Sequence, residues 1–424
     1  MKGVRLLETT HLKLIVAHPG KQHSYQMAGA LEQAGYLSKY VTTVYDSDNS
    51  ILMRIVKRLI GGQDRRRANS RSTNLIPQNK VKQFCEFRGL LVLAILRIDK
   101  KRRIYNWYSD HVARKFGKKV AMLAIKENAD AIICYDTSAK YCFEILKEKA
   151  PHITRVLDNA AMNRYGLFML YQEMNRKYGI LRDKTGFKSY LLNEKECHKY
   201  KEEAYLADYH IVASSFSKST LTIIGIDETR IALIPYGVDS DGIPQKTYYS
   251  KDGKLKILYA GEVSPQKGIY NLIEMARIFR NEVEFHVVGS GMEKLTLEIQ
   301  NEINENMVVH GYLLQEDLFK LYSDCDVFVF PSLGDGFGFV VIEAMLAGLP
   351  VICSTNSVGA DAIIDGNNGF VFDAGDSKAL KERIDYFLAN RSQIEIMGRN
   401  AIQQAKSFSW DNYGRKIDAF VREL

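Results

Sequence analysis

Residues 327–354, VFVFPSLGDGFGFVVIEAMLAGLPVICS, contain the arrangement that decides the fold. A short apolar run predicts a buried strand, and a glycine-rich loop that holds Asp335 follows it. The apolar pattern then predicts a helix over residues 339–347, which Gly348 ends, before a second strand at residues 350–354. A strand, a helix and a second strand in this order indicate a parallel sheet with helices on both faces.

The same alternation runs through both halves of the chain. β-Branched runs in the first half predict strands at residues 12–18, 40–45, 131–136, 154–158 and 209–214. In the second half they predict strands at residues 255–261, 284–290, 307–311, 327–332, 350–354 and 369–373. Because 424 residues exceed the usual size of one core, we predict an α/β protein of two doubly wound, Rossmann-like domains that face an interdomain cleft.

Composition excludes several classes of protein. With 46% hydrophobic and 25% charged residues, the chain is globular rather than disordered or fibrous. Its six cysteines show no CxxC spacing, which argues against a zinc site or a disulfide framework and favours a reducing cytosol. The first residues lack a signal-peptide pattern and no run of about 18 apolar residues occurs, so we expect neither export nor a membrane span.

The positive charge is concentrated in residues 51–120, which hold 19 Lys and Arg against four acids in a chain of net charge +8. Within this segment ILMRIVKRLIGG places Ile51, Ile55, Leu59 and Ile60 at helical spacing among cations, and FRGLLVLAILRIDKKRRIYNWY joins an apolar run to Lys100–Arg103. This pattern is typical of a surface that binds an anionic membrane. The alternative is a solvated loop with two core helices. Nucleic acid is less favoured, because few aromatic residues lie between the cations.

Chemically active residues follow the predicted strands of the second half. Ligands of doubly wound sheets bind at the carboxyl ends of the strands, so these positions are candidates for a site. They are Gly261, Glu262, Lys267 and Gly268 after the first strand, Gly289, Ser290 and Gly291 after the second, Gly311 after the third, and Asp335, Gly336, Phe337 and Gly338 after the fourth.

The glycine-rich loop and the helix after it suit a phosphorylated sugar. Glycines let backbone N–H groups approach a ligand closely, and a helix N-terminus favours an anion such as a diphosphate. Asp335 can accept hydrogen bonds from sugar hydroxyls, and Glu343 can bind the diol of a ribose with its two oxygens. Taken alone, Asp335 could instead cap the helix, Glu343 could be a surface glutamate and Lys267 a solvated turn residue.

These motifs resemble the retaining glycosyltransferases of family 4, also named glycosyl transferases group 1, which have the GT-B fold. The resemblance covers ILYAGEVSPQKGIYNLIEMA, VFVFPSLGDGFGFVVIEAMLAGLPVICS and FSWDNY, and more loosely VAHPGKQHSYQMAGALEQAG and IPYGVD. Its most specific part is an acid followed after seven residues by a glutamate, here Asp335 and Glu343, although the first acid is usually glutamate. The resemblance implies that Glu343 binds the donor ribose, Asp335 the donor sugar and Lys267 the diphosphate.

Two positions depart from the family pattern. The family usually has an arginine shortly before the lysine, where this chain has Glu262, an acid that repels phosphate unless another cation compensates or its side chain points away. The family often has a histidine after a middle strand of the first domain, where this chain has Asp158 and Asn159.

The first domain is expected to hold the acceptor. The sequence AHPGKQHS, residues 17–24, follows the first strand, and its histidines and lysine lie where a sugar or phosphate can approach. The candidate residues are therefore Asp335, Lys267, Asp158 and His18 as catalytic groups; Glu343, Gly336, Phe337, Gly338, Gly291, Ser290, Gly311 and Glu262 for the donor; and Gly20, Lys21 and His23 for the acceptor or the cleft. A lone histidine is more often structural, which is the alternative for His18 and His23.

Pro, Gly, Asp and Ser gather in residues 235–254, which we interpret as the domain boundary. We expect an N-terminal acceptor domain over residues 1–240, with its basic segment at 51–120. A nucleotide-sugar domain then covers residues 241–405, and a C-terminal helix over 406–424 packs back on the first domain.

The predicted function is retaining transfer of a sugar from a UDP- or GDP-sugar to a growing glycan or lipid-linked saccharide, on the inner face of the cell membrane. The leaving diphosphate can itself accept the acceptor's proton, so we expect no metal or other cofactor. A noncatalytic nucleotide-sugar-binding subunit of a membrane-docked complex is the alternative. A nicotinamide-dependent oxidoreductase is disfavoured, because no GxGxxG follows a strand.

Overall fold

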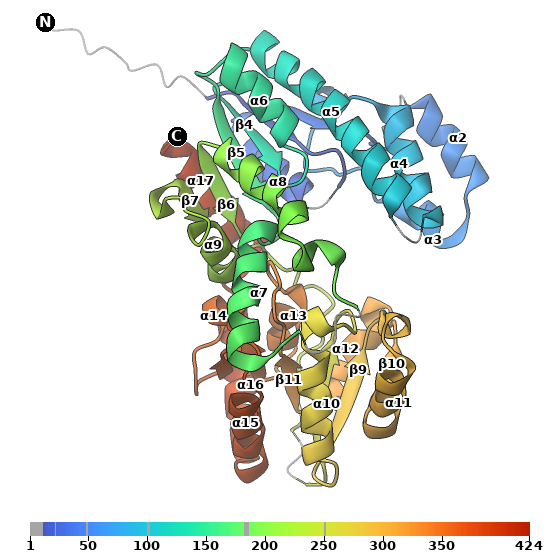
Figure 1. The fold of residues 1–424 in the computed structure, drawn as a ribbon, viewed down its shortest axis with the longest axis vertical. Coiled ribbons are helices and arrows are strands. Elements are labelled where there is room, and N and C mark those ends of the chain that lie inside the picture. Colours follow the sequence, from blue (N-terminus) through green and yellow to red (C-terminus); the bar gives the residue numbers. More distant parts are fainter. Residues whose placement is uncertain (1–11, 22, 48–49, 100–101, 182–185, 250–251) are drawn as a thin grey trace, which may run out of the picture. The chain divides into compact units, whose positions relative to one another are not determined.

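The computed structural model describes residues 12–424 except 22, 48–49, 100–101, 182–185 and 250–251 (Figure 1). Contacts within the chain divide it into two compact units. Unit 1 comprises residues 1–160, 202–211 and 414–424, and unit 2 comprises residues 161–201 and 212–413. Residues 235–254 fall inside unit 2, and the domain boundary near residue 240 stays a prediction from the sequence.

The first sheet has seven strands in the order β3-β2-β1-β4-β5-β6-β7. The strands are β1 Leu14–Ala17, β2 Leu37–Thr42, β3 Val81–Gln83, β4 Ala131–Tyr135, β5 Thr154–Asn159, β6 Tyr209–Val212 and β7 Ile231–Leu233. The pairs from β3 to β5 are parallel. Every residue of β1 and of β4 is buried, as expected for strands covered on both faces.

The second sheet has six parallel strands in the order β10-β9-β8-β11-β12-β13. The strands are β8 Leu255–Ala260, β9 Val283–Val288, β10 Val308–Gly311, β11 Val327–Phe330, β12 Val351–Ser354 and β13 Gly369–Phe372. The two sheets confirm the predicted α/β fold of two Rossmann-like, doubly wound parts. All eleven predicted strands are present, although β2 begins three residues earlier than predicted and ends at residue 42. The short strands β3 and β7 were not predicted.

Helices connect the strands along the whole chain. Those of the first half are α1 Ser24–Gln33, α2 Ile51–Leu59, α3 Gly62–Asn69, α4 Glu86–Ile98, α5 Arg103–Lys126, α6 Lys140–Lys149, α7 Arg164–Tyr178, α8 Glu194–Tyr205 and α9 Ser215–Thr222. Those of the second half are α10 Ile269–Ile278, α11 Leu297–Asn306, α12 Gln315–Asp324, α13 Phe339–Leu346, α14 Gly359–Ala362, α15 Ser377–Ala389, α16 Ser392–Ala405 and α17 Trp410–Arg422. Among the described residues, no helix has the length and apolar character needed to cross a membrane.

The core of unit 1 lies between the sheet and the helices α5 and α6. Apolar residues of β1, β4 and β5 pack there against Phe116, Val120 and Phe143, all of which are buried. The final helix adds to this unit, since the Tyr36 hydroxyl donates to Asp418 Oδ1 at 3.1 Å and Phe420 packs edge-on against Tyr209. The predicted helix over residues 339–347 is α13, and Gly348 ends it with a φ of 94°.

Candidate functional site

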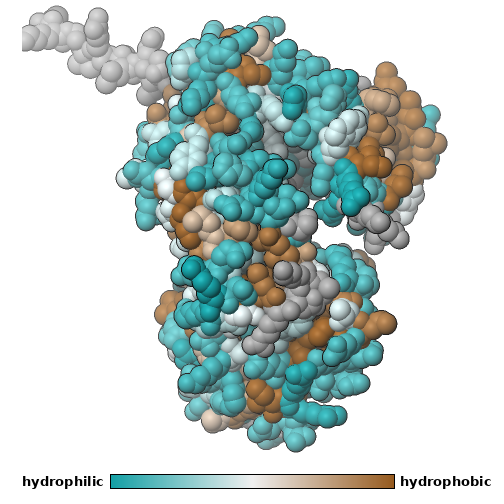
Figure 2. Space-filling model, in the orientation of Figure 1, coloured by the Kyte–Doolittle hydropathy of each residue, from teal (hydrophilic) through white to brown (hydrophobic). Residues whose placement is uncertain are grey.

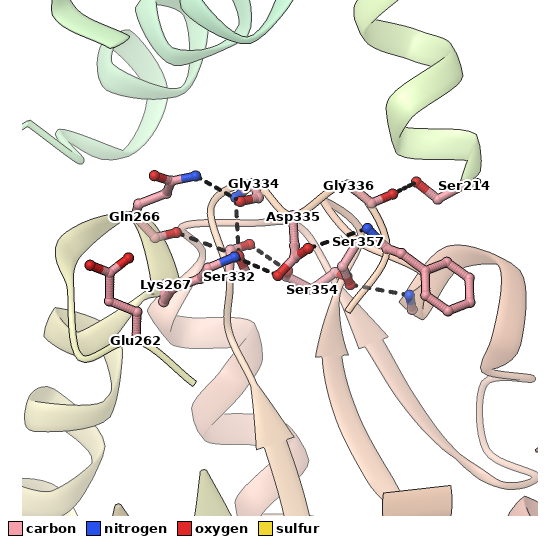
Figure 3. Close-up of polar contacts among 12 residues, drawn as sticks. Ser214, Glu262, Gln266, Lys267, Ser332, Gly334, Asp335, Gly336, Ser354 and Ser357 are labelled. Atoms are coloured by element: carbon pink, nitrogen blue, oxygen red, sulfur yellow. Dashed lines mark hydrogen bonds and ion pairs between the residues drawn. The ribbon is translucent and has the colours of Figure 1, made fainter. Parts of the chain in front are cut away.

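The candidate site in unit 2 lies where the strand order reverses. The neighbouring strands β8 and β11 continue into loops that lead in opposite directions across the sheet, and such a switch point is where doubly wound sheets bind ligands. Lys267 follows β8 and Asp335 follows β11, and the Lys267 ammonium forms an ion pair with Asp335 Oδ2 (Figure 3). The structure therefore brings together two residues that lie 68 positions apart in the sequence.

The loop before α13 is held at both edges of one peptide unit. The Gly336 carbonyl accepts hydrogen bonds from the hydroxyls of Ser214 at 2.7 Å and Ser217 at 2.9 Å. On the opposite edge of the same peptide, the Phe337 N–H donates to Asp335 Oδ1 at 3.2 Å. We expected the Phe337 N–H to face an anion, but it is already used by Asp335.

Two other backbone N–H groups of this loop remain available. Gly336 and Gly338 are buried, and within the described part of the chain their N–H groups have no protein acceptor. A buried N–H without an acceptor costs free energy comparable to a lost hydrogen bond, so a ligand acceptor here would be favourable. Gly338 has a φ of 94° and directly precedes α13, whose N-terminus adds a positive field. With Lys267 beside them, these groups form a site suited to an anion.

The loops of the site are fastened to one another by hydrogen bonds (Figure 3). The Gln266 amide donates to the Gly334 carbonyl at 3.1 Å, and the Leu333 N–H donates to the Gln266 carbonyl at 2.9 Å. The Ser354 hydroxyl donates to the Ser332 carbonyl at 2.6 Å. The Asp335 carboxylate is therefore held on a rigid base between the ends of β8, β11 and β12.

Glu343 lies on α13, about one turn after Phe339, the first residue of the helix. It is partly buried, and the Tyr322 hydroxyl lies 3.4 Å from Glu343 Oε2. Burial raises the pKa of the Glu343 carboxyl above its ordinary value, although the Tyr322 hydroxyl partly opposes this shift. A half-buried carboxylate with one hydroxyl partner keeps lone pairs for further donors, as a ribose diol would require.

Glu262, which seemed unsuited to a phosphate site, is neutralised by a cation that sequence reasoning missed. Lys294 Nζ lies 2.7 Å from Glu262 Oε1. Burial alone would raise the pKa of Glu262, but Lys294, with Lys188 and Lys267, lowers it. The carboxylate is thus ionised and paired, which reduces its repulsion of a phosphate.

The remaining predicted donor residues line the ends of β9 and β10. The Ser290 carbonyl accepts from the Val263 N–H at 2.8 Å, and the Gly291 N–H donates to Glu293 at 3.0 Å. The Gly311 carbonyl accepts from the Gly289 N–H at 2.8 Å. A Cβ on Gly289 would lie 1.7 Å from the Gly261 carbonyl oxygen, so glycine is needed where these two loops touch.

In unit 1, His18 and Gly20 form one compact turn after β1. The Gly20 N–H donates to His18 Nδ1 at 2.7 Å, and the His18 ring packs edge-on against Tyr135. In the neutral ring the proton therefore resides on Nε2. His18 is 8% exposed, and a Cβ on Gly20 would lie 2.9 Å from the His18 ring.

Lys21 and His23 follow the same turn, next to a cation that the sequence did not indicate. Burial, followed by the charge of Arg71, lowers the pKa of Lys21. Burial lowers the pKa of His23 to about 4, so His23 is neutral at pH 7. Arg71 follows α3 and its backbone carbonyl accepts a hydrogen bond from the Tyr25 hydroxyl at 2.8 Å. These residues form a second, positively charged group in unit 1.

Asp158 is the next-to-last residue of β5 and is 1% exposed. Its neighbour in the sheet, Tyr135, ends β4. Another buried acid was missed by sequence reasoning: the Glu203 carboxylate accepts from the N–H groups of Thr137, Ala139 and Lys140 at 2.7, 2.9 and 3.0 Å. It fixes the turn between β4 and α6, a role that no local motif reveals.

Comparison with known proteins shows what the second part of the chain resembles. Residues 245–404 match the family of glycosyl transferases group 1. The capsular polysaccharide biosynthesis glycosyltransferase CapM of Staphylococcus aureus is 29% identical over 236 residues, which are 51% of this chain and 60% of that protein. The O-antigen chain mannosyltransferase B of Escherichia coli is 29% identical over 236 residues, 52% of this chain and 61% of that protein. The chain thus spans about three fifths of the length of these relatives.

Solved structures of similar fold cover nearly the whole chain. Sucrose-phosphate synthase from Thermosynechococcus elongatus aligns with a TM-score of 0.63 at 19% identity and covers 97% of this chain and 99% of its own. Anabaena HepE in complex with UDP aligns with a TM-score of 0.61 at 15% identity, over 97% of this chain and all of its own. At sequence identities of 15–19%, the similarity to these structures concerns the fold alone, and this fold is GT-B. The residues that match the group 1 family, 245–404, include Lys267, Asp335 and Glu343.

Proposed function

We propose that this protein is a retaining glycosyltransferase that moves a sugar from a UDP- or GDP-sugar to a growing glycan or lipid-linked saccharide in cell-surface polysaccharide synthesis. The observation that carries the proposal is the anion site at the switch point, made of Lys267 and the N–H groups of two buried residues, Gly336 and Gly338. The named functions of CapM and the O-antigen mannosyltransferase support the pathway class, and HepE bound to UDP-glucose supports the donor class.

The geometry suggests a role for each group of the donor site. The Lys267 ammonium and the amides of the loop would stabilise the charge that grows on the leaving diphosphate. Asp335 Oδ1 and Oδ2 each have one protein partner and retain lone pairs for hydroxyls of the donor sugar. Glu343 would bind the ribose.

The anomeric configuration is retained if the acceptor approaches the face of the donor sugar from which the diphosphate leaves. The acceptor hydroxyl then bonds to the anomeric carbon as the bond from that carbon to the phosphate oxygen breaks, and the departing phosphate takes the hydroxyl proton. Oxocarbenium-like charge develops during this exchange, and Asp335 is a carboxylate that can stabilise it. In unit 1, His18 Nε2–H would orient the acceptor, and Asp158 or Asn159 would stand where the family often has a histidine.

Turnover of the donor tests the proposal. Replacing Lys267 by Gln removes the cation that faces the leaving group, and a loss of about 100-fold in kcat is expected from similar deletions of one stabilising donor. Lys320→Gln is the matched control, because Lys320 is an exposed lysine of unit 2 whose ammonium pairs with the local Asp317. Release of UDP or GDP from a panel of nucleotide-sugars is measured. A parent protein that binds these donors but releases nothing with a broad acceptor panel would support the noncatalytic alternative.

We also propose that unit 1 binds the inner face of the cell membrane through α2, α3, α4 and the start of α5. Large apolar side chains are exposed there, among them Leu59 at 80%, Ile98 at 81% and Trp107 at 71% (Figure 2, over α2). Arg65–Arg67 on α3 supply cations for anionic headgroups. Ile60 does not join this surface, because it packs against Val44, Met53 and Ala68. Lys100 and Lys101 lie outside the described residues.

Sedimentation with vesicles tests the membrane proposal. Ile98→Asp removes one large exposed apolar group and adds a negative charge, so binding to anionic vesicles should fall about tenfold. Leu297→Asp is the control, because Leu297 is 76% exposed on α11 of unit 2. Equal pelleting of parent and Ile98→Asp, or equal pelleting of the parent with neutral and anionic vesicles, would contradict the proposal.

A further inference from the structure

A basic groove in unit 1 lies apart from every residue singled out above as catalytic. It has a volume of about 1110 Å³ and runs between the edge strand β3, the start of α4 and the second half of α5. Four of its lysines, Lys115, Lys118, Lys119 and Lys126, repeat at helical spacing on one face of α5. The opposite face of α5 is buried in the core of unit 1, so the lysine face is fixed in place.

The charge of the groove is strongly unbalanced. Lys39, Lys82 and Arg88 line it together with the four lysines of α5, against only two acids. None of these seven cations forms an ion pair with a carboxylate in the described parts of the chain. One of the two acids, Glu86, already accepts a hydrogen bond from the Ser50 hydroxyl. Seven like charges repel one another, so a polyanion in the groove would relieve this repulsion.

The floor of the groove is apolar and partly aromatic. Phe84, Met122 and Leu123 line it, and the Lys119 ammonium lies over the Phe84 ring, 5.5 Å from its centre. A sugar ring has one apolar C–H face, which packs on such a floor, while acidic substituents at its rim meet the lysines. The lysine-bearing stretch from 115 to 126 is about 16 Å long at the usual helical rise, enough for several sugar units.

We propose that this groove binds an acidic glycan, that is, a chain of sugars that carry carboxylates or phosphodiesters, as the acceptor polymer. A bilayer is a poorer occupant, because a flat surface cannot follow a concave groove. Single-stranded nucleic acid is also disfavoured, because it needs successive aromatic platforms and the groove has Phe84 and Phe87. That the glycan is the acceptor of the reaction rests on the proposed function. That the groove binds an acidic glycan does not.

Calorimetric binding of defined hexamers tests the inference. The parent should bind hexagalacturonate, and maltohexaose, a neutral glycan of equal length, should bind at least tenfold more weakly. Lys118→Gln with Lys126→Gln should weaken hexagalacturonate binding about tenfold, since two exposed charge contacts each contribute a factor of about three. The control, Lys147→Gln with Lys149→Gln, removes the same charge from exposed positions on α6 and should leave the affinity unchanged. Gln keeps the helix propensity in both pairs.

Labelling of Cys85 locates the ligand. Cys85 lines the groove and is partly exposed, whereas the other five cysteines are buried, so a maleimide should react with the native protein at Cys85 alone. Saturating hexagalacturonate should slow this reaction in the parent. In the groove variant, the concentration that just saturates the parent should give clearly weaker protection.

Several results would overturn the inference. One is an equal loss of hexagalacturonate affinity in the groove and control variants, and another is tighter binding of hexathymidylate than of hexagalacturonate. The inference also fails if anionic vesicles protect Cys85 when hexagalacturonate does not, or if hexagalacturonate binds without protecting Cys85. The donor assay with Lys267→Gln tests a different site. The proposed function and the proposed glycan binding in the groove can therefore be refuted independently of each other.

Discussion

Replacing Glu343 by Gln removes one negative charge from α13 with almost no change of shape. The Tyr322 hydroxyl lies 3.4 Å from Glu343 Oε2 and 3.5 Å from the Val340 carbonyl, so an amide oxygen still offers it an acceptor. The free energy of unfolding should therefore change by less than about 0.5 kcal/mol. Hydrogen bonds from ribose hydroxyls to a charged acceptor are worth about 1.5–3 kcal/mol, so the variant should bind the donor about 10- to 100-fold more weakly.

Isothermal calorimetry with UDP- and GDP-sugars measures this loss. Glu382→Gln on α15, which changes an exposed glutamate of the same unit, should keep the parent's affinity. Because burial raises the pKa of Glu343 and only its ionised form accepts two hydrogen bonds, affinity should fall on acidification, starting above the ordinary glutamate range. The Gln variant should lack this step. Equal affinity and an equal pH profile in parent and variant would refute the ribose contact.

Three further predictions concern stability and cofactors. Gly268→Ala should lower the free energy of unfolding by about 2 kcal/mol or more. The Cβ of the new alanine would lie 2.0 Å from the Pro331 carbonyl oxygen. Gly311→Ala, at a similar positive φ but in open space, should cost only about 1 kcal/mol in denaturant titrations. Burial, followed by the charge of Asp136, raises the pKa of Glu203 to about 7, so the folded state binds this proton more tightly than the unfolded state. Stability should then fall as the pH rises from about 5 to 8, by about 3 kcal/mol at most, and Glu203→Gln should flatten that slope. Transfer activity should survive EDTA, and a loss that magnesium or manganese restores would contradict the metal-free account.

Local pattern was enough to predict the strands of the second unit and the residues that follow them. In unit 2, each run that we predicted as a strand folds as one strand, and the strand-end rule placed Lys267 and Asp335 at one edge of the sheet. The strands β3 and β7 were missed because three residues are too few to show alternation.

Long-range contacts explain what the sequence could not reveal in the site. The hydroxyls of Ser214 and Ser217 hold the Gly336 carbonyl from about 120 positions away in the chain, and neither belongs to a motif. Lys294 pairs with Glu262 across 32 positions in the chain. This ion pair explains how an acid can stand where the family usually has an arginine. The sequence showed the positive charge of the lysines on α5. It could not show that tertiary packing places these lysines opposite β3 and so forms a groove.

The central claim is that the ends of β8 and β11 hold a nucleoside diphosphate-sugar. A crystal structure of the protein with UDP or GDP bound tests it most directly. The account predicts the diphosphate at Lys267 and the N–H groups of Gly336 and Gly338, with the ribose hydroxyls on the Glu343 carboxylate. A nucleotide bound elsewhere, or a diphosphate that leaves the Lys267–Asp335 pair and these amides untouched, would contradict it.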